Sequence, residues 1–475
     1  MNNVDILFII PPFHMRNGGG SFFPLGTGYI ISSLEKRGYS WAIINCTEYI
    51  HSYYEEDLAK LEIILYEKLS SFSPLVVGIG PCVTTQLRAL KKISLVCGKV
   101  FTNIPIFAGG PFTSIEGQEW VFNEVLGIKY LVKGDGEFAI PDVIQTIKES
   151  GDIRNSLCVS YGKNSKINVV KNLDVLEFPF RDFVKEDTYS IRRKSLSGRQ
   201  TSMIASRGCP YSCSYCVSGN MKSNQVPFRR RSNDNIIQEM RKLKDEHGIS
   251  DVVFYDDCFF SNRNKLSESI GEFCNMLLEA ELGMQWQIEM RPDFFVLLSI
   301  NELVLLREAG CRQINIGIEK ISQNGLLFLG KNGSLEGLKE KISLAREKYE
   351  IQISATFILG GEEESEDDIK QLVDYAKELS LDFAHFNPLF VYPGTPLFNK
   401  VFLNKREWVD IVLMDKLPWG EIVYENENLD REQLLRLIDY AYKEFYKDTS
   451  LAHEQMIEDR FNIKRVEGEK GNADF

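Results

Sequence analysis

The feature of the sequence that most limits its fold is a repeated alternation of short apolar runs with longer helical stretches. In the first 150 residues, apolar runs with the character of β-strands occupy 4–10, 41–46, 76–80, 104–110 and 128–134. Stretches suited to helices lie between them, for example 27–37, 53–70 and 84–99. Continuous apolar strands joined by helical crossovers are typical of a parallel sheet covered on both faces. The sequence therefore predicts an α/β fold that begins with a doubly wound, Rossmann-like domain.

A second alternation begins at residue 201. Its predicted strands are 201–206, 251–256, 284–289, 312–318, 352–359 and 382–388. Its predicted helices are 232–246, 264–280, 299–309, 334–348 and 365–379. Six βα units of this length predict a partial (β/α)6 barrel, related to the eight-unit TIM barrel.

The pattern predicts four segments along the chain. They are a doubly wound domain (1–150), a linker with a hairpin near Gly162 to Lys166 (151–198), the partial barrel (199–400) and a short helical C-terminal region with a last helix near 430–447 (401–475).

Composition limits the partners and the compartment. The 475 residues carry a net charge of -12, which argues against nucleic acid as the main partner, since phosphate binding needs a basic surface. The run Arg229 to Arg231 is interpreted as a solvated loop. The sequence shows neither a signal peptide nor an apolar stretch of membrane-spanning length, so we expect no membrane association. Ten cysteines without an export signal favour the reducing cytoplasm.

Polar or glycine residues follow every strand of the predicted barrel. In chain order they are the cysteine group 209–216, Asp256 with Asp257, Arg291, Glu319, Gly360 with Gly361, and His385 with Asn387. Barrel chemistry occurs where strands end and loops begin, so six such ends predict one site at the barrel mouth. Glycines and prolines follow the N-terminal strands in the same way, which predicts a ligand crevice there.

Cys209, Cys213 and Cys216 form the pattern C-x3-C-x2-C. Thiolates suit zinc or an iron–sulfur cluster. Structural zinc needs four ligands, and the sequence offers no second pair that would complete such a site. A thiol–disulfide centre needs only two cysteines. A [4Fe–4S] cluster held by three thiolates leaves one iron open for a substrate or cofactor. The other seven cysteines stand singly and are predicted to be buried.

These motifs resemble the radical S-adenosylmethionine (radical SAM) superfamily, and in particular its subfamily with an N-terminal B12 (cobalamin)-binding domain. The resemblance covers about residues 1–400. Besides the cysteines and the aromatic Tyr215, it rests on FYDD (254–257), EMRPD (289–293), GIE (317–319), PGTP (393–396), PLGTGYIISSLEKRGY (24–39), FAGGP (107–111) and KGDGE (133–137). The fifth strand departs from the family, because GGEEESEDDI (360–369) replaces the proline and second glycine of the related turn with glutamates.

The resemblance implies a [4Fe–4S] cluster on Cys209, Cys213 and Cys216, whose open iron binds SAM for reductive cleavage to a 5′-deoxyadenosyl radical. It also implies that Tyr215 contacts adenine, and that Asp256 or Asp257 receives the methionine amino group. Arg291 would pair with the methionine carboxylate, a role suited to its fork of donors. The remaining implied SAM contacts are Glu319 to the ribose and Gly360 and Gly361 to the adenine.

The resemblance further implies cobalamin in the N-terminal domain. The pattern D-x-H-x-x-G, which supplies a histidine to cobalt, is missing from the sequence, although His14 is a candidate for the lower face of the corrin. The contacts expected for cobalamin are Pro12, Gly19, Gly20, Thr84, Gly109, Gly110, Gly134 and Glu137.

Three functions are open at this point. The first is a cobalamin-dependent C-methyltransferase that modifies a small metabolite or peptide, as in natural product biosynthesis. The second is a cobalamin-independent radical dehydratase, epimerase or cyclase acting on a sugar or antibiotic precursor. The third is a non-catalytic corrinoid or iron–sulfur binding module, which the complete set of strand-end groups disfavours. The candidates for catalytic residues are Cys258, Asp256 and His385, and flavodoxin or ferredoxin is expected as the electron donor.

Overall fold

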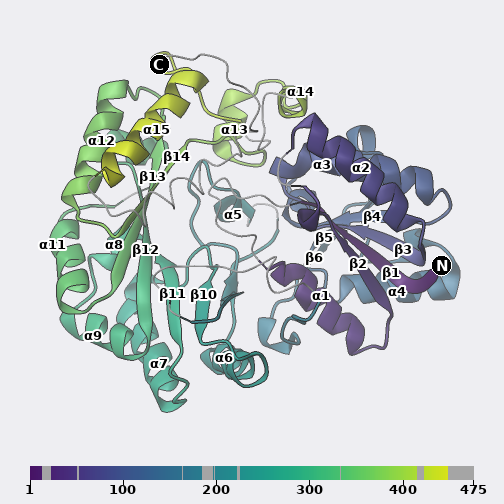
Figure 1. Ribbon diagram of the computed structural model, residues 1–475, viewed down its shortest axis with the longest axis horizontal. Coiled ribbons are helices and arrows are strands. Elements are labelled where there is room, and N and C mark those ends of the chain that lie inside the picture. Colours follow the sequence, from purple (N-terminus) through teal and green to yellow (C-terminus); the bar gives the residue numbers. More distant parts are fainter. Residues whose placement is uncertain are drawn as a thin grey trace.

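The fold was obtained as a computed structural model, which describes residues 1–12, 23–50, 53–162, 164–183, 196, 198–221, 225–331, 333–414 and 422–447. Two six-stranded parallel sheets lie side by side, each with helices packed against it (Figure 1). The α/β fold predicted from the alternation is confirmed, and every predicted strand is present within a few residues of its expected bounds. In the described part of the chain, no helix is both long and apolar enough to span a membrane.

The N-terminal sheet has the strand order β2-β1-β3-β4-β5-β6. Its elements are β1 (Asn2–Ile10), α1 (Leu25–Glu35), β2 (Trp41–Asn45), α2 (Glu55–Leu69), β3 (Phe72–Ile79), α3 (Leu87–Val100), β4 (Ile106–Gly109), β5 (Tyr130–Gly134), α4 (Ala139–Ser150) and β6 (Ile167–Asn168). The order reverses between β1 and β3, which is the switch point where doubly wound sheets bind ligands. The short β6 lies within the predicted linker and pairs with β5 in parallel, so this sheet reaches Asn168. The predicted hairpin is a single bridge between Tyr161 and Asn164.

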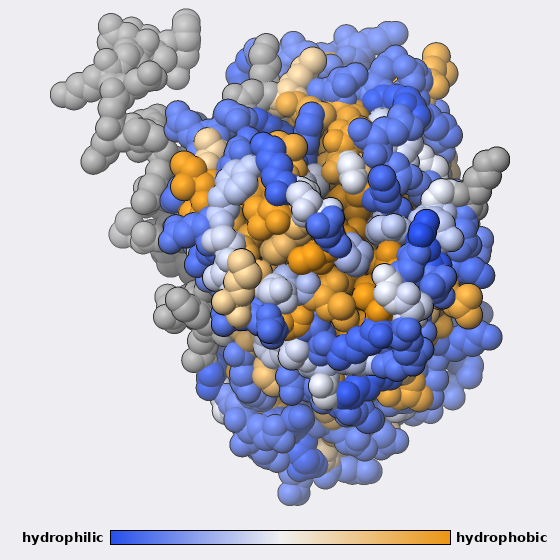
Figure 2. Space-filling model, turned by 90° about the vertical axis from the view of Figure 1, so that its right-hand side faces the viewer, coloured by the Kyte–Doolittle hydropathy of each residue, from blue (hydrophilic) through white to orange (hydrophobic). Residues whose placement is uncertain are grey.

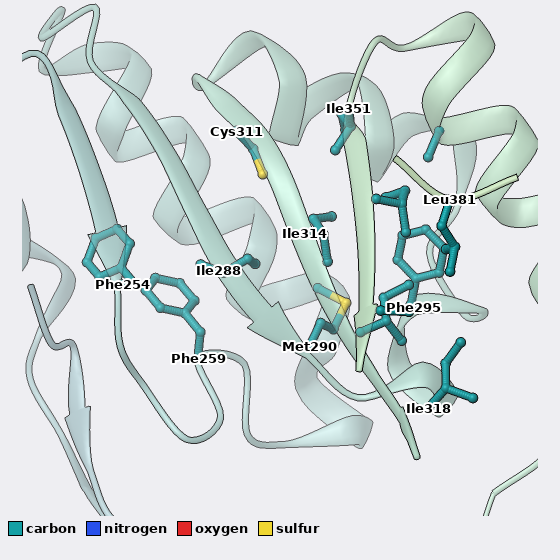
Figure 3. Packing of buried hydrophobic residues seen from close by; sticks show 14 of the residues in the cluster. Phe254, Phe259, Ile288, Met290, Phe295, Cys311, Ile314, Ile318, Ile351 and Leu381 are labelled. Carbon is teal, nitrogen blue, oxygen red and sulfur yellow. The ribbon is translucent and has the colours of Figure 1, made fainter. Parts of the chain in front are cut away.

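The second sheet has its strands in chain order, from β7 at one edge to β14 at the other. Its strands and the helices between them are β7 (Gln200–Met203), α6 (Asn233–His247), β10 (Asp251–Phe254), α7 (Leu266–Glu279), β11 (Gln285–Met290), α9 (Ile300–Glu308), β12 (Cys311–Glu319), α11 (Leu338–Ser343), β13 (Gln352–Leu359), α12 (Glu366–Glu378) and β14 (Phe383–Pro388). One face carries Phe254, Ile288 and Ile314 into a core shared with these helices (Figure 3). The sheet curls into the expected partial barrel.

Shorter elements complete the structure. They are β8 (Ser206–Arg207), α5 (Val217–Asn220), β9 (Arg229–Arg230), α8 (Pro292–Phe295), α10 (Gln323–Phe328), α13 (Pro396–Val401), α14 (Glu407–Leu413) and α15 (Arg431–Tyr446). The last helix closes the β14 edge of the barrel. The hydroxyl of Tyr446 accepts from the Ala384 N–H at 2.9 Å, and that of Tyr442 accepts from the Phe386 N–H at 2.8 Å. Helix α15 thereby supplies partners that a seventh strand would otherwise provide.

The run Arg229 to Arg231 is not a solvated loop, so that interpretation is wrong. Arg229 and Arg231 are 8% and 4% exposed, and each pairs with a buried carboxylate. The run looked solvated because Asp135 is distant in sequence and because the burial of Glu239 on α6 cannot be seen from the sequence. Six of the seven single cysteines are buried as predicted, and Cys158 is half-buried.

The outer face of the N-terminal half is mostly hydrophilic, with hydrophobic residues gathered near its centre (Figure 2). Among the described residues of this half, the exposed apolar side chains include Ile63 on α2 and Leu95 on α3. Exposed apolar groups of this kind are ordinary on a protein of this size.

Candidate active site

The cysteine loop lies between the two sheets, just before α5 (Figure 1). Ser214, between Cys213 and Tyr215, is fastened on both sides. Its N–H donates to the Leu329 carbonyl at 2.9 Å and its hydroxyl donates to the Phe328 carbonyl at 2.8 Å. Its own carbonyl accepts from the Leu397 N–H at 3.0 Å, at the start of α13. The end of α10 and Leu397, directly after the PGTP motif, therefore hold the cysteine loop in place.

The side chain of Asn220 closes the loop from within. Its amide donates to the carbonyl of Cys213 at 2.9 Å and to that of Cys216 at 2.7 Å. Gly219 is required here, because a Cβ at this position would lie 2.8 Å from the Tyr211 carbonyl oxygen. Sequence reasoning missed both residues, although they lie only three and four positions beyond the last cysteine.

The three thiols suit an iron–sulfur cluster better than one zinc ion. Among the residues that the structure describes, no three His, Cys, Asp or Glu side chains converge on a single metal ion. A mononuclear zinc site needs its sulfur ligands about 2.3 Å from one ion. Burial is the largest influence on the Cys216 thiol and raises its pKa to about 12, so a bound metal would have to displace the proton. The donor set of three thiols on one tightly held loop fits a cluster with one open iron.

Glu319 offers the clearest vacant hydrogen-bond acceptor near this loop. It ends β12 with φ +68°, a left-handed backbone that a glutamate rarely adopts. Its Oε1 accepts from the Lys331 Nζ at 3.0 Å and from the Tyr215 hydroxyl at 3.2 Å. Its Oε2 is buried without a hydrogen-bond partner among the described residues. A buried acceptor of this kind is costly unless a ligand donates to it, and the hydroxyls of a nucleoside would do so.

Arg291 lies next to the first half of the cysteine loop, at Tyr211. Its guanidinium stacks 4.1 Å from the centre of the Tyr211 ring, and its Nε donates to Asp293 at 2.9 Å. Tyr211, between the first two cysteines, donates its hydroxyl to the Ser261 carbonyl at 3.1 Å. The arginine is thus held next to the cysteine loop, where it is able to bind a carboxylate. Sequence reasoning missed Tyr211, although it lies inside the cysteine motif.

Asp256 and Asp257 have different surroundings. Asp256 is 2% exposed and accepts hydrogen bonds from the Ala205 N–H at 2.9 Å and from the Ser206 hydroxyl. Burial raises the pKa of Asp256 to about 6, although these hydrogen bonds act to lower it. Asp257 is exposed and interacts electrostatically with Cys209 and Cys216. Of the two, Asp257 is therefore the carboxylate that a ligand at the cysteines would reach, while Asp256 joins β10 to the start of the cysteine loop.

The glycine turn after β13 is held by contacts from Lys320 and Asn426. Gly360 has φ +85°, and its carbonyl accepts from the buried Lys320 Nζ at 2.9 Å. The same ammonium donates to both oxygens of Glu364 at 2.6 Å. Asn426, in the C-terminal region, donates to the carbonyls of Gly361 and Glu364. Glu364, which stands at the glutamate position of the related turn, is therefore a structural partner of Lys320.

Of the two other predicted catalytic residues, Cys258 lies near the cysteine loop and His385 lies on β14. Cys258 is 3% exposed, its thiol donates to the Phe260 carbonyl at 3.2 Å, and Cys209 acts on it electrostatically. His385 is half-buried on β14, paired in register with Thr356 of β13.

The face of the barrel sheet opposite the helices is polar. In register across the strands it carries Gln287 beside Gln313, and Glu289 beside Asn315 and Ser354. Ser354 donates to Asn315 at 2.9 Å, and Gln313 donates to Ser354 at 2.8 Å. Gln287 Oε1 is buried and has no hydrogen-bond partner in the described parts of the chain. This wall suits a substrate with several hydrogen-bonding groups.

Those residues predicted to contact cobalamin that the structure describes lie at or just beyond the carboxyl ends of the N-terminal strands. The Pro12 carbonyl, just after β1, accepts from the Tyr53 hydroxyl at 2.7 Å and from Gln86 at 3.2 Å. Thr84 begins a short helix after β3. Both flank the switch point between these two strands, which is where a doubly wound sheet binds a cofactor. Gly19, Gly20 and His14 lie outside the described residues.

The glycines after β4 and β5 have packing roles. A Cβ at Gly110 would lie 2.4 Å from the Cys82 N, and one at Gly134 would lie 2.1 Å from the Asn168 carbonyl oxygen. Gly109 is less crowded, with its nearest contact at 3.6 Å. Glu137 is 3% exposed and pairs with Arg207. Gly110 and Gly134 are thus explained by the close approach of chains, with or without a cofactor.

The carboxyl ends of the two sheets face each other across the cysteine loop. A Cβ at Gly394, in the PGTP turn of the barrel, would lie 2.5 Å from Ile115 of the N-terminal half. Phe112 packs edge-on against Trp408 of α14, with ring centres 6.0 Å apart. Tyr215 packs against the hydrophobic cluster that these two halves share.

Comparison with known proteins agrees with this geometry. Residues 203–376 match the model of the radical SAM superfamily. The chain therefore contains a radical SAM domain. It is an enzyme that uses SAM and a [4Fe–4S] cluster.

Relatives of similar length give the wider context. The chain is 24% identical to the uncharacterized methyltransferase PH0819 of Pyrococcus horikoshii, over 98% of both chains. It is 25% identical to the anaerobic magnesium-protoporphyrin IX monomethyl ester cyclase of Cereibacter sphaeroides, over 94% of this chain and 71% of the cyclase. Among solved structures, the radical SAM methyltransferase TsrM of Kitasatospora setae, with tryptophan and a SAM analogue bound, superposes with a TM-score of 0.65 at 17% identity. That comparison covers 94% of this chain and 90% of TsrM, and both halves therefore share one fold with it.

Proposed function

We propose that this enzyme is a cobalamin-dependent radical SAM methyltransferase that methylates a carbon of a small metabolite or peptide. The observation that carries the proposal is the facing arrangement of the two sheets. The segment after β4 of the N-terminal sheet, with Phe112 and Ile115, lies against α14 and the PGTP turn of the barrel half. TsrM, which has this fold, has been solved with cobalamin and a [4Fe–4S] cluster bound. Cobalamin, when bound, supplies a methyl carrier that the protein side chains cannot provide.

The residues of this chain would hold and orient the reactants. Cys209, Cys213 and Cys216 supply the cluster ligands. We assign the methionine end of SAM to Arg291 and Asp257, because one is a fixed guanidinium and the other an exposed carboxylate beside the cysteines. The nucleoside end then falls at Tyr215 and Glu319, whose Oε2 would accept from the ribose.

The polar wall of the barrel would orient the substrate. Glu289, Asn315 and Gln287 offer a carboxylate and two amides on one face. Such groups favour a compact, polar molecule over a large apolar one. We further propose flavodoxin or ferredoxin as the electron donor, since SAM cleavage consumes one electron. The electron donor and the expectation that nucleic acid does not bind stay predictions.

A second candidate function is radical cyclisation of the substrate without cobalamin. The similarity to the magnesium-protoporphyrin ester cyclase over nearly the whole chain favours cyclisation. In that reaction the substrate radical would be rearranged, and the N-terminal half would have a structural role only.

One experiment separates the two functions. The protein is purified anaerobically, reconstituted with iron and sulfide, and titrated with hydroxocobalamin under spectroscopic observation. It is then reduced with titanium(III) citrate in the presence of SAM, and S-adenosylhomocysteine and 5′-deoxyadenosine are measured. We expect the protein to bind the corrinoid stoichiometrically. We also expect S-adenosylhomocysteine to form only when the corrinoid is present. Failure to bind hydroxocobalamin in the titration, in a protein that still forms 5′-deoxyadenosine, would reject the methyltransferase and favour the second function.

A pair of cysteine variants tests the cluster itself. Cys213→Ala should abolish 5′-deoxyadenosine formation, because it removes a cluster ligand. Cys274→Ala, which alters a buried cysteine on α7, should keep it. Equal activity of the two variants would show that the three-cysteine motif does not hold the cluster.

A further inference from the structure

Four charged residues meet where the N-terminal sheet approaches the cysteine loop. Asp135 and Glu137 lie in the KGDGE segment between β5 and α4, and Arg207 and Arg229 lie on β8 and β9. Arg207 donates from Nη1 to Asp135 at 2.8 Å and from Nη2 to Glu137 at 2.5 Å. Arg229 donates to the other oxygen of Asp135. Two guanidinium groups therefore neutralise two carboxylates across the boundary between the halves.

This group is largely withdrawn from solvent. The side chains of Asp135, Glu137 and Arg229 are 7%, 4% and 7% exposed, and that of Arg207 is 17% exposed. Burial by itself raises the pKa of Asp135, but Arg207 and Arg229 outweigh it and hold that pKa below its ordinary value. Buried ion pairs contribute little net stability, but they impose one geometry, because any other arrangement leaves a buried charge without a partner.

Further contacts fix the group from both sides. On the N-terminal side, the Ser33 hydroxyl donates to the Glu137 carbonyl, and the Tyr29 ring lies 5.0 Å from the Arg207 guanidinium. On the other side, Arg229 also donates to the Val170 carbonyl at 2.8 Å, and the Val170 N–H donates to Asp135 at 2.7 Å. Glu137 Oε2 is buried and lacks a hydrogen-bond partner in the described chain, so its only ion pair is with Arg207.

Arg207 is also two residues before Cys209. It ends β8, which pairs with β9 through Ser206 to Arg230 and Arg207 to Arg229. Gly208 then turns the chain, with φ +80°, into the cysteine loop. A shift of the N-terminal sheet edge would therefore move the Arg207 guanidinium and, two residues later, the first cluster ligand Cys209.

We infer that Arg207, held between Asp135 and Glu137, is a positioning residue that fixes the cluster loop against the carboxyl edge of the N-terminal sheet. This role differs from the contact with cobalamin that the sequence predicted for Glu137. It requires the arginine fork, since a lysine ammonium cannot reach two carboxylates with parallel donors. The inference concerns SAM cleavage at the cluster and does not depend on methyl transfer.

A matched control lies at the same boundary between the halves. Arg406 makes two hydrogen bonds to Glu124, at 2.7 and 3.0 Å, and also joins the two halves of the chain. Both of these side chains are 56% exposed. An exposed pair is worth little and imposes little geometry, so Arg406→Lys should leave the cluster unaffected.

The test compares Arg207→Lys, Glu137→Gln and Arg406→Lys with the wild-type enzyme, reconstituted without cobalamin. Iron and sulfide content and the thermal midpoint are measured first. Dithionite-driven formation of 5′-deoxyadenosine and the electron paramagnetic resonance spectrum of the reduced cluster, with and without SAM, are then recorded. Small displacements of reacting groups cost up to about 100-fold in rate, so we expect a loss of at least tenfold in Arg207→Lys and Glu137→Gln. The iron and sulfide content of these two variants should match that of the wild-type enzyme. The change that SAM causes in the electron paramagnetic resonance spectrum of their clusters should differ from the wild-type change.

Two results would overturn the inference. One is SAM cleavage by Arg207→Lys and Glu137→Gln at the rate of Arg406→Lys. The other is a SAM-cleavage rate that falls only in proportion to the iron and sulfide content, while the cluster that remains gives the wild-type resonance spectrum with SAM. That result would show a purely structural role. If Arg207→Lys does not fold, Glu137→Gln decides, because it keeps the Arg207–Asp135 pair. These outcomes do not depend on corrinoid binding. Rejection of the positioning role of Arg207 would therefore leave the methyltransferase proposal unaffected, and rejection of the methyltransferase would leave the positioning role unaffected.

Discussion

The ion pair between Lys331 and Glu319 is predicted to couple the stability of the barrel to SAM binding. The two side chains are 11% and 9% exposed, and the Lys331 ammonium also donates to the Gly317 carbonyl at 2.8 Å. Lys331→Met would leave Glu319 as a buried charge with only the Tyr215 hydroxyl as a donor. Removing one partner of a buried pair costs about 3–5 kcal/mol, and we expect the free energy of unfolding to fall by that amount.

Glu319→Gln should cost less, because it removes the charge and leaves Lys331 bonded to Gly317. Loss of one such charged hydrogen bond costs about 1.5–3 kcal/mol. In the double variant neither group is left as an unpaired charge, so its cost should fall below the sum of the single costs by at least about 1 kcal/mol. Glu319→Gln should in addition weaken SAM binding, since the ribose would lose an ionised acceptor.

The measurement is urea denaturation of the four proteins under anaerobic conditions, with SAM affinity determined by calorimetry. Lys370→Met is the control, because its pair with Glu366 on α12 is exposed, and we expect a change below about 0.5 kcal/mol. Coupling between Lys331 and Glu319 below about 0.5 kcal/mol would refute the reasoning, as would unchanged SAM affinity in Glu319→Gln.

Two other predictions follow from single positions. Gly219→Ala should lower iron incorporation, because its Cβ would lie 2.8 Å from the Tyr211 carbonyl oxygen, whereas Gly271→Ala on α7, with no atom within 4 Å of its Cβ, should keep full iron content. Asp135→Asn should be less stable than the wild-type protein by a constant amount from pH 8 to about pH 5, because the lowered pKa of Asp135 adds stability above its unfolded value of about 3.9. That difference should shrink as pH falls through the lowered pKa, and a difference that instead grows in acid would contradict the ion-pair assignment.

The strands and helices could be predicted because they follow from local pattern. Apolar runs such as 352–359 bury one face against helices and carry Ser354 on the other, and β13 has those bounds. The cysteine motif was equally local. Its three ligands, with Tyr215, lie within one loop of eight residues, and their spacing was enough to predict the cluster chemistry.

The partners of these residues could not be predicted in the same way. Lys331 approaches Glu319 only because α10 carries the chain back past the end of β12. Lys320 pairs with Glu364, a residue 44 positions further along the chain. The buried state of Arg229 and Arg231 depends on carboxylates 94 and 8 residues away, respectively.

The sequence by itself therefore determined the two sheets, the chemistry of the cysteine loop and the residue types at the barrel mouth. These features depend on hydrophobic periodicity and on ligand spacing, which are properties of short segments. Only the tertiary structure decided which charges are buried together and which end of the N-terminal sheet meets the cluster. Electrostatic pairing acts over a few ångströms in space and does not depend on separation along the sequence. The pairing of Arg207 with Glu137 could therefore be recognised only in the folded chain.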